Sequence, residues 1–253
     1  MTRFAIISDI HGNFAALESV LRRIDRLRVD EIICLGDVVG YGPRPDACLN
    51  TVMRRCAHVV QGNHDEAVLD PAVDRGFNEN ARAAIRWTRS TLGPLHLDAI
   101  CNFPTALYLG RDTVCFHDTP NREQTNYLNG AGAASLAFTR LDRPICLVGH
   151  THVPMVFECD AAAGPTPEPE TITCHRPVDA MPIPLRADGR YICNPGSVGQ
   201  PRDADPRASF AILDLDRRSF TVHREAYDIV ATQMETQRVG LPLILARRLD
   251  VGA

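Results

Sequence analysis

Five short groups of acidic, amide and histidine residues each follow an apolar run that is typical of a β-strand. The groups are Asp9-Ile10-His11, Gly36-Asp37, Gly62-Asn63-His64-Asp65, His117 and Gly149-His150-Thr151-His152. In open α/β sheets, ligands bind at the carboxyl ends of the strands. We therefore expect these side chains to converge at one rim, where they would bring together five of the nine histidines.

The side chains in these groups are of the kinds that bind divalent metal ions. Carboxylate, imidazole and amide oxygen, without thiolate, suit Mn²⁺, Fe²⁺, Zn²⁺ or Ni²⁺. They are too many for one tetrahedral zinc ion, which takes four ligands. Two ions about 3.5–4 Å apart, bridged by one carboxylate, would use all of them and form the clamp of hydrolytic phosphoryl transfer.

Each group alone has a simpler interpretation. An Asp or Gly-Asp after a strand is a common turn or helix cap, and residues 62–65 could be a hydrogen-bonded turn. His150 and His152 would point to opposite faces if the strand continued through them. The prediction of a metal centre rests on finding all five groups, in this order, after apolar runs.

The elements that would position these groups begin as alternating strands and helices. Residues 4–8, 31–35 and 58–61 are predicted strands, and residues 14–27 and 46–55 are predicted helices. This alternation indicates βαβ units and a mainly parallel sheet.

The rest of the chain is predicted to contain more strands than helices. Helices are expected at 78–92 and at 229–249, the latter interrupted near 240–242, and short strands at 106–109, 113–116, 145–148, 153–158, 191–193, 210–214 and 220–224. Their close spacing favours antiparallel sheet in the second half. We expect a single domain over residues 1–253, with a Pro- and Ala-rich insertion at about 160–190.

The composition limits the chemistry. The 253 residues carry 27 basic and 31 acidic side chains, and all 27 basic residues are arginine. Lysine Schiff bases and phosphate-binding loops that need lysine are therefore excluded, so phosphate must be bound by arginine, histidine, backbone N–H groups or metal. The net charge of −4 argues against a broad nucleic-acid-binding surface.

The nine cysteines are scattered through apolar runs without a CxxC pair, which indicates small buried side chains in a reducing compartment. No stretch of 18 apolar residues and no secretory signal is present. We expect a cytoplasmic protein that does not interact with membranes and that could form a homo-oligomer.

The five groups, in this order, resemble the calcineurin-like metallophosphoesterase superfamily, whose motifs are D-x-H, G-D, G-N-H-[DE], a histidine and G-H-x-H. Residues 36–43 and 194–202 are similar to two further loops of its small bacterial and archaeal phosphodiesterase branch. The resemblance implies an α/β fold: a four-layer α/β/β/α sandwich with two mixed β-sheets and the metals at the sheet rim.

The resemblance also implies a role for each site residue. One metal would be held by Asp9, His11 and His152, and the other by Asn63, His117 and His150. Asp37 would bridge the two ions, and a hydroxide shared by them would attack phosphorus in line. His64 would protonate the leaving oxygen or stabilise the transition state, and Asp65 would orient His64 or a neighbour.

The sequence departs from the family in two places. Protein serine/threonine phosphatases and diadenosine tetraphosphatases carry an arginine soon after the second motif, whereas residues 36–42 contain none; Arg44 or Arg202 could replace it. Asp118 follows His117 where relatives usually have glycine. Two further questions stay open. Residues 194–197 could bind an anion or form a supporting turn. Three aromatic side chains could line a cleft or lie in the core: Tyr41, Trp87 and Tyr127.

These observations predict a hydrolase for phosphodiesters or phosphomonoesters of small molecules, with two divalent ions as cofactors, Mn²⁺ or Fe²⁺ before Zn²⁺ or Ni²⁺. The alternatives are a serine/threonine phosphoprotein phosphatase, a dinucleotide polyphosphatase, or a non-catalytic scaffold stabilised by metal.

Overall fold

The computed structural model describes residues 3–120 and 127–253. The strands are β1 (Arg3–Ile7), β2 (Glu31–Cys34), β3 (His58–Val59), β4 (Ala106–Leu109), β5 (Thr113–Phe116), β6 (Ile145–Leu147), β7 (Met155–Asp160), β8 (Thr173–His175), β9 (Pro182–Pro184), β10 (Gly189–Asn194), β11 (Ala208–Asp214) and β12 (Ser219–Glu225). The α-helices are α1 (Phe14–Leu27), α2 (Pro45–Arg55), α3 (Asn63–Leu69), α4 (Glu79–Thr91), α5 (Pro94–Cys101), α6 (Ala131–Phe138), α7 (Ile229–Arg238) and α8 (Leu243–Arg247).

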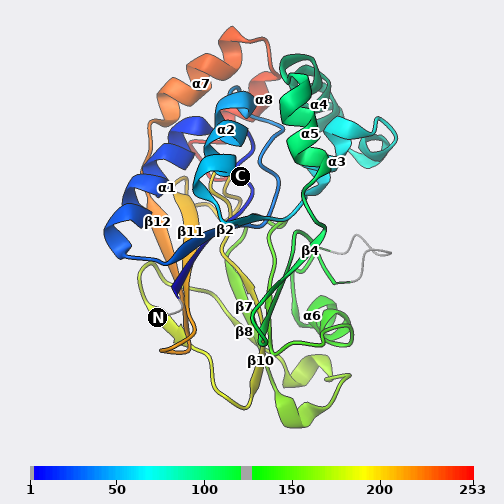
Figure 1. The fold of residues 1–253 in the computed structure, drawn as a ribbon, viewed down its shortest axis with the longest axis vertical. Helices are drawn as coiled ribbons and strands as arrows, with labels where there is room; N and C mark the ends of the chain where they lie inside the picture. Colours follow the sequence, from blue (N-terminus) through cyan, green and yellow to red (C-terminus); the bar gives the residue numbers. More distant parts are fainter. Residues whose placement is uncertain (1–2, 121–126) are drawn as a thin grey trace.

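The strands form two six-stranded mixed sheets (Figure 1). The first has the order β3-β2-β1-β11-β12-β9, and its strands β1, β2 and β3 are parallel. The second has the order β4-β5-β6-β10-β7-β8, in which β5, β6 and β10 are parallel. The carboxyl ends of β1, β2 and β3 and those of β5 and β6 therefore each open onto a common edge.

Alternation along β1 separates two cores. Ala5 and Ile7 pack toward α1 and α2, whereas Phe4 and Ile6 pack between the two sheets against side chains such as Tyr191. Successive side chains of a strand point to opposite faces, so a continuous apolar run is what a strand covered on both faces requires. Asn13 caps α1 by accepting a hydrogen bond from the Ala16 backbone N–H.

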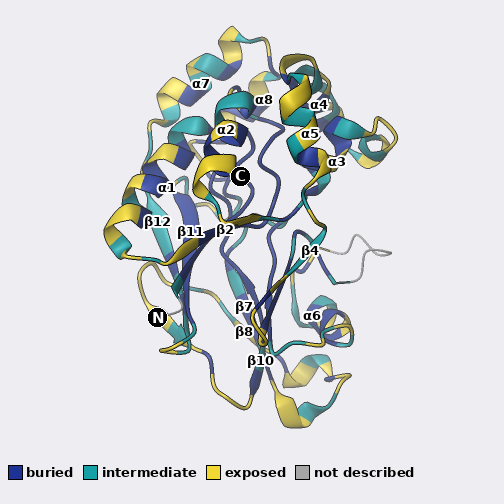
Figure 2. Ribbon diagram, in the orientation of Figure 1, coloured by how far each residue is buried: buried dark blue, intermediate teal, exposed yellow. Residues whose placement is uncertain are grey.

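A third core lies between the second sheet and α6, where Phe138 packs on Phe157 and Ile192. In Figure 1, α1 and α2 lie over the first sheet and α6 lies on the outer side of the second. The expected four-layer α/β/β/α sandwich with two mixed sheets is thus confirmed. In Figure 2 the strands and the loops at the centre of the molecule are mostly buried, and exposed residues lie on the helices and in the peripheral loops.

The structure differs from the expected elements in the second half. The segment predicted as an insertion supplies β8 to one edge of the second sheet and β9 to one edge of the first. Its proline-rich part forms short 3₁₀ turns, held where Ser135 Oγ donates to the Pro167 carbonyl. The expected antiparallel pairing holds for β7, β8, β11 and β12, but β10 pairs with β6 in parallel. The last helix is interrupted as predicted.

No helix among the residues that the structure describes is both long and apolar enough to cross a membrane. None of the nine cysteines forms a disulfide, and six of them are buried.

Glu158 on β7 joins three parts of the second sheet. Its carboxylate accepts hydrogen bonds from His175 Nε2 at 2.7 Å and from Tyr191 Oη at 3.1 Å, and it pairs with Arg186 Nε at 2.9 Å. Burial raises the pKa of Glu158, but these hydrogen bonds outweigh it and hold the pKa below its usual value. The carboxylate therefore stabilises the fold above its unfolded-state pKa, and this contribution is lost as pH falls through the folded-state pKa.

We predict that Glu158→Gln lowers the unfolding temperature at pH 7 by about 2–4 °C, because partial exposure limits the loss to about 1 kcal/mol. The difference from wild type should shrink between pH 5 and pH 3 in thermal melts followed by circular dichroism. Glu170→Gln, at an exposed position, is the control and should leave the melting temperature unchanged. An undiminished difference at pH 3 would contradict the role of the charge.

Candidate metal centre

The loops after β1, β2, β3, β5 and β6 bring all the predicted site residues to one place at the rim of both sheets. Ten non-glycine residues in the described parts of the chain have positive φ, and six of these lie in this region: Asp9, His11, Asp37, Tyr41, His150 and His152. This left-handed backbone is costly for most residues, with Asn, Asp and His tolerating it best. Six such residues in one region show that the loops are held in conformations set by the site.

The rings of His11 and His152 face each other through their Nε2 atoms. Their Nδ1 atoms lie 3.1 and 2.6 Å from the carbonyl oxygens of Val39 and Gln200, so each Nδ1 carries the proton and donates it. Burial lowers the pKa of both rings well below the usual value, so both are neutral. Their Nε2 atoms, only 3.1 Å apart, are both acceptors and cannot hydrogen-bond to each other.

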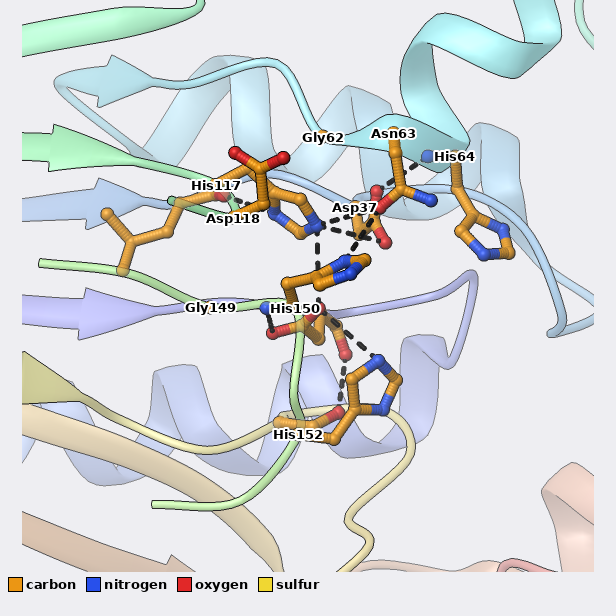
Figure 3. A network of polar contacts seen from close by, with 12 residues as sticks. Asp37, Gly62, Asn63, His64, His117, Asp118, Gly149, His150 and His152 are labelled. Atoms are coloured by element: carbon orange, nitrogen blue, oxygen red, sulfur yellow. Dashed lines mark hydrogen bonds and ion pairs between the residues drawn. The ribbon is translucent and has the colours of Figure 1, made fainter. Parts of the chain in front are cut away.

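The histidine that follows β5 is arranged in the same way. His117 Nδ1 lies 2.8 Å from the carbonyl oxygen of Leu35, and its Nε2 faces Asn63 Oδ1 at 3.1 Å and Asp37 Oδ2 at 3.3 Å. His150 Nδ1 lies 3.0 Å from the same Asn63 oxygen. Figure 3 shows these side chains, from four loops, pointing toward one another.

The two predicted carboxylates lie among these rings. Asp37 Oδ2 is 3.5 Å from His11 Nε2 and 3.3 Å from His117 Nε2, so it stands between the two groups of ligands. Asp9 Oδ1 is 3.4 Å from His152 Nε2. Both aspartates are almost fully buried.

The charges of this cluster favour a cation. Burial raises the pKa of Asp9. Burial would also raise the pKa of Asp37, but His117, His64 and His11 together outweigh it and hold this pKa well below the usual value. Burial favours a neutral His117, yet Asp37 raises the pKa of that ring to about 10. The Asp9 and Asp37 carboxylates therefore favour a positive charge among the side chains that converge here.

The donor set fits divalent metal ions. Buried lone pairs of imidazole, carboxylate and amide that face one another need a positive charge between them, and these are the ligands that borderline divalent ions prefer. Potential ligand atoms lie within 4.8 Å of one another in three groups: Asp9, His11 and His152; His11, Asp37 and His64; and Asp9, Asp37 and His117. Asp9, His11 and Asp37 each belong to two of these groups.

The glycines of the motifs allow the loops to approach the ligands closely. A Cβ atom at Gly62 would lie 2.1 Å from Asp37 Oδ1, and one at Gly149 would lie 2.0 Å from Ser8 Oγ and 2.8 Å from Asp9 Oδ2. Both positions therefore exclude any side chain, for steric reasons rather than for a special backbone angle.

His64 and Asp65 have different roles. His64 donates its backbone N–H to Asp37 Oδ1, its ring packs on Phe77 and Tyr41, and its Nδ1 has no hydrogen-bond partner in the described chain. Burial lowers the pKa of His64 to about 4, so the ring is neutral. Asp65 accepts hydrogen bonds from the backbone N–H groups of Gly62, Val38 and Val39, not from His64. Asp65 thus fixes the Asp37 loop against α3.

Asp118 does not join the ligands. Its carboxylate accepts a hydrogen bond from the Thr119 backbone N–H at 2.6 Å, and in Figure 3 it points away from the His117 ring. The departure from glycine at this position therefore leaves the His117 side chain in place.

The segment 194–202 supports the first ligands rather than presenting free N–H groups. Val198 and Gly199 donate their backbone N–H groups to the carbonyls of Ser8 and Asp9, and Ser197 Oγ also donates to the Asp9 carbonyl. The Gln200 N–H is bound to Ser197 Oγ. Of the two interpretations of this loop, the structure therefore favours the supporting turn.

A pocket of about 130 Å³ opens over the cluster. Its lining comprises Asp37, Tyr41, Asn63, His64, Gly76, Phe77, Asn78, Ala81, Tyr127, His150, His152 and Arg202. Tyr127 stacks on the His150 ring with centroids 4.6 Å apart. Tyr41 and Tyr127 thus line the cleft, whereas Trp87 packs against an apolar cluster at α4 and α8.

Sequence reasoning missed Phe77 and the three carbonyls that orient the histidines. Phe77 precedes α4 and nothing in its local sequence marks it, and a backbone carbonyl carries no sequence signal. The four histidines expected to lie outside the site do so: His58, His96, His175 and His223.

Residues 2–218 match the calcineurin-like phosphoesterase superfamily domain, and the chain belongs to this family. An uncharacterised protein of Methanocaldococcus jannaschii is 32% identical over 251 residues, covering 98% of this chain and 97% of that protein. A metallophosphoesterase from Sphaerobacter thermophilus is 40% identical, with a TM-score of 0.86 over 100% of this chain and 99% of that chain. A hypothetical protein from Pyrococcus horikoshii OT3, 19% identical, shares the fold with a TM-score of 0.76 over 100% of this chain and 99% of that chain.

We predict that Gly149→Ala disrupts the centre, because the added methyl group must displace Ser8 or Asp9. The cost should be about 1–3 kcal/mol of unfolding free energy, as for other overpacked sites, together with weaker Mn²⁺ binding. Urea unfolding and Mn²⁺ titration calorimetry measure both effects. Gly93→Ala is the control, since nothing lies within 4 Å of its added Cβ. Equal behaviour of the two variants would contradict the steric argument.

We also predict that Mn²⁺ raises the unfolding temperature of the wild type. A ligand that binds only the folded state at a hundredfold excess over its Kd stabilises it by about 2.7 kcal/mol. Asp9→Asn keeps the shape of the side chain but removes a buried negative charge, so it should lose most of this Mn²⁺-dependent increase without lowering the metal-free unfolding temperature. Differential scanning fluorimetry with and without Mn²⁺ tests this, and a full increase in the variant would exclude Asp9 as a ligand.

Proposed function

We propose that the protein is a phosphoesterase that depends on two divalent metal ions and hydrolyses phosphodiesters or phosphomonoesters of small molecules. The observation that carries this proposal is the pair of neutral, buried His11 and His152 rings whose Nε2 lone pairs face each other beneath a pocket. Membership of the calcineurin-like phosphoesterase superfamily supports the same chemistry.

In this proposal one ion is held by Asp9, His11 and His152, and the other by Asn63, His117 and His150, with Asp37 shared. The lack of thiolate ligands suits Mn²⁺ or Fe²⁺ first, and Zn²⁺ or Ni²⁺ next. When bound, the ions would neutralise phosphoryl charge and supply an activated water for in-line attack on phosphorus.

The other residues of the pocket would position and protonate the substrate. The His64 ring lines the pocket, where it would hydrogen-bond to the leaving oxygen. Asp65 would keep Asp37 in place through the loop backbone. The pocket of about 130 Å³ suits a phosphoryl group and part of its ester group.

A cytoplasmic location agrees with nine cysteines of which none forms a disulfide.

We expect the Mn²⁺-loaded protein to hydrolyse bis-p-nitrophenyl phosphate, p-nitrophenyl phosphate or both. His64→Gln should lower kcat by about 10²- to 10⁴-fold, the usual contribution of general acid–base catalysis, while Mn²⁺ content measured by mass spectrometry stays the same. Asp37→Asn should lower both activity and Mn²⁺ content.

The control is Glu170→Gln, which lies on an exposed turn and should retain full activity. Absence of turnover with each of Mn²⁺, Fe²⁺, Ni²⁺ and Zn²⁺ would refute the enzyme and favour a metal-stabilised scaffold. Undiminished activity in His64→Gln would refute the role of this ring but not the metal centre.

A further inference from the structure

Among the residues that the structure describes, Arg202 is the arginine that lines the pocket. It lies with Asp37, His64, His150 and His152 around the same space. Its guanidinium lies 5.9 Å from the centre of the Tyr41 ring, and the Tyr41 ring in turn contacts the rings of His11 and His64. A positive side chain therefore stands directly beside the proposed ligands of the first ion.

Among the residues that the structure describes, no acid forms an ion pair with Arg202. Its Nη2 donates a hydrogen bond to the Gln200 amide oxygen at 2.9 Å, and its Nε is buried without a partner in the described chain. Within residues 3–120 and 127–253, no carboxylate lies at ion-pair distance from it. Arg44, Arg207 and Arg224 each have such a carboxylate.

The backbone holds Arg202 in place from both sides. Its own N–H donates to the His152 carbonyl at 3.3 Å, and the preceding Gln200 carbonyl accepts the Nδ1 proton of His152. On the other side, Asp203 is paired with Arg224, which is almost fully buried. The guanidinium is thus presented by a fixed loop, which lowers the entropy lost when it binds a ligand.

Arg44, the other candidate from the sequence, is occupied elsewhere. It pairs with Glu235 Oε1 at 3.5 Å and lies over the Phe14 ring, and it does not line the pocket. Arg202 and Arg44 therefore differ in position and in charge balance, although the sequence alone left them equivalent.

We propose that Arg202 binds a non-bridging oxygen of the substrate's phosphoryl group and so fixes the orientation of that group over the metal centre. This inference rests on the proposed function, because it assumes that the pocket takes a phosphate ester. An uncompensated guanidinium is suited to the task, since its planar set of N–H donors matches phosphate oxygens. In a chain without lysine, arginine is also the one permanently charged side chain available for it.

Direct binding of inorganic phosphate to the Mn²⁺-loaded protein tests the proposal by isothermal titration calorimetry. Arg202→Ala should raise the phosphate Kd by about 10- to 100-fold, as expected for the loss of a charge-assisted contact. Arg202→Lys should recover only part of this loss, because it restores the charge without the planar fork. Arg44→Ala should bind phosphate like the wild type.

Two measurements separate this role from a structural one. Mn²⁺ content and the unfolding temperature of Arg202→Ala should match those of the wild type, and added guanidinium chloride at millimolar concentration should partly restore phosphate binding. Where an ester is turned over, Arg202→Ala should raise KM and lower kcat/KM by at least tenfold.

The outcomes distinguish this inference from the proposed function. Weaker phosphate binding in Arg202→Ala, with normal Mn²⁺ content, supports the inference even if none of the tested esters is hydrolysed. An unchanged phosphate Kd overturns the inference even in an active enzyme. A third outcome also overturns the inference. If Arg202→Ala and Arg202→Lys both lose Mn²⁺ or fail to fold, and guanidinium does not rescue them, the residue has a structural role.

Discussion

The structure depends on buried lone pairs that face one another. His11 and His152 turn their unprotonated nitrogens together at 3.1 Å, and Asp9 and Asp37 add carboxylates within 4 Å of these rings. The two facing Nε2 atoms are unfavourable unless a cation lies beside them, because these buried acceptors have lost their water and cannot hydrogen-bond to each other. The fold therefore retains an arrangement that packing alone would not select, and metal binding is the event that would make it favourable.

Two features of the fold maintain this arrangement. Backbone carbonyls of Leu35, Val39 and Gln200 lie at hydrogen-bond distance from the Nδ1 atoms of His117, His11 and His152, which turns each Nε2 toward the centre of the cluster. The proposed ligands also come from both sheets, since the Asp9, Asp37 and Asn63 loops follow the first sheet and those of His117 and His150 follow the second. The apolar layer between the sheets thus sets the distance between the two halves of the centre.

The sequence predicted some features of the fold and the candidate site and missed others. Strand and helix positions up to β3 followed from hydrophobic patterning, and α1 has the predicted bounds, whereas α3 was not predicted. The convergence of the candidate site residues could be predicted because their groups follow strands and strand ends converge. Strands β8 and β9 were missed because each is three residues long and is stabilised by pairing with a distant edge. The tautomers of the histidines and the difference between Arg44 and Arg202 depend on contacts between residues far apart in sequence, such as His152 with Gln200 and Arg44 with Glu235.

The segment 194–202 shows how one loop can serve both metal and substrate. Its first part donates hydrogen bonds to the carbonyls of Ser8 and Asp9, its Gln200 carbonyl orients His152, and its last residue presents a guanidinium to the pocket. A shift of this loop would therefore move a proposed metal ligand and the proposed phosphate-binding group together. Because the loop has little freedom to move one without the other, the position of the phosphoryl group is tied to the position of the first ion, and this coupling is what in-line attack at a metal centre requires.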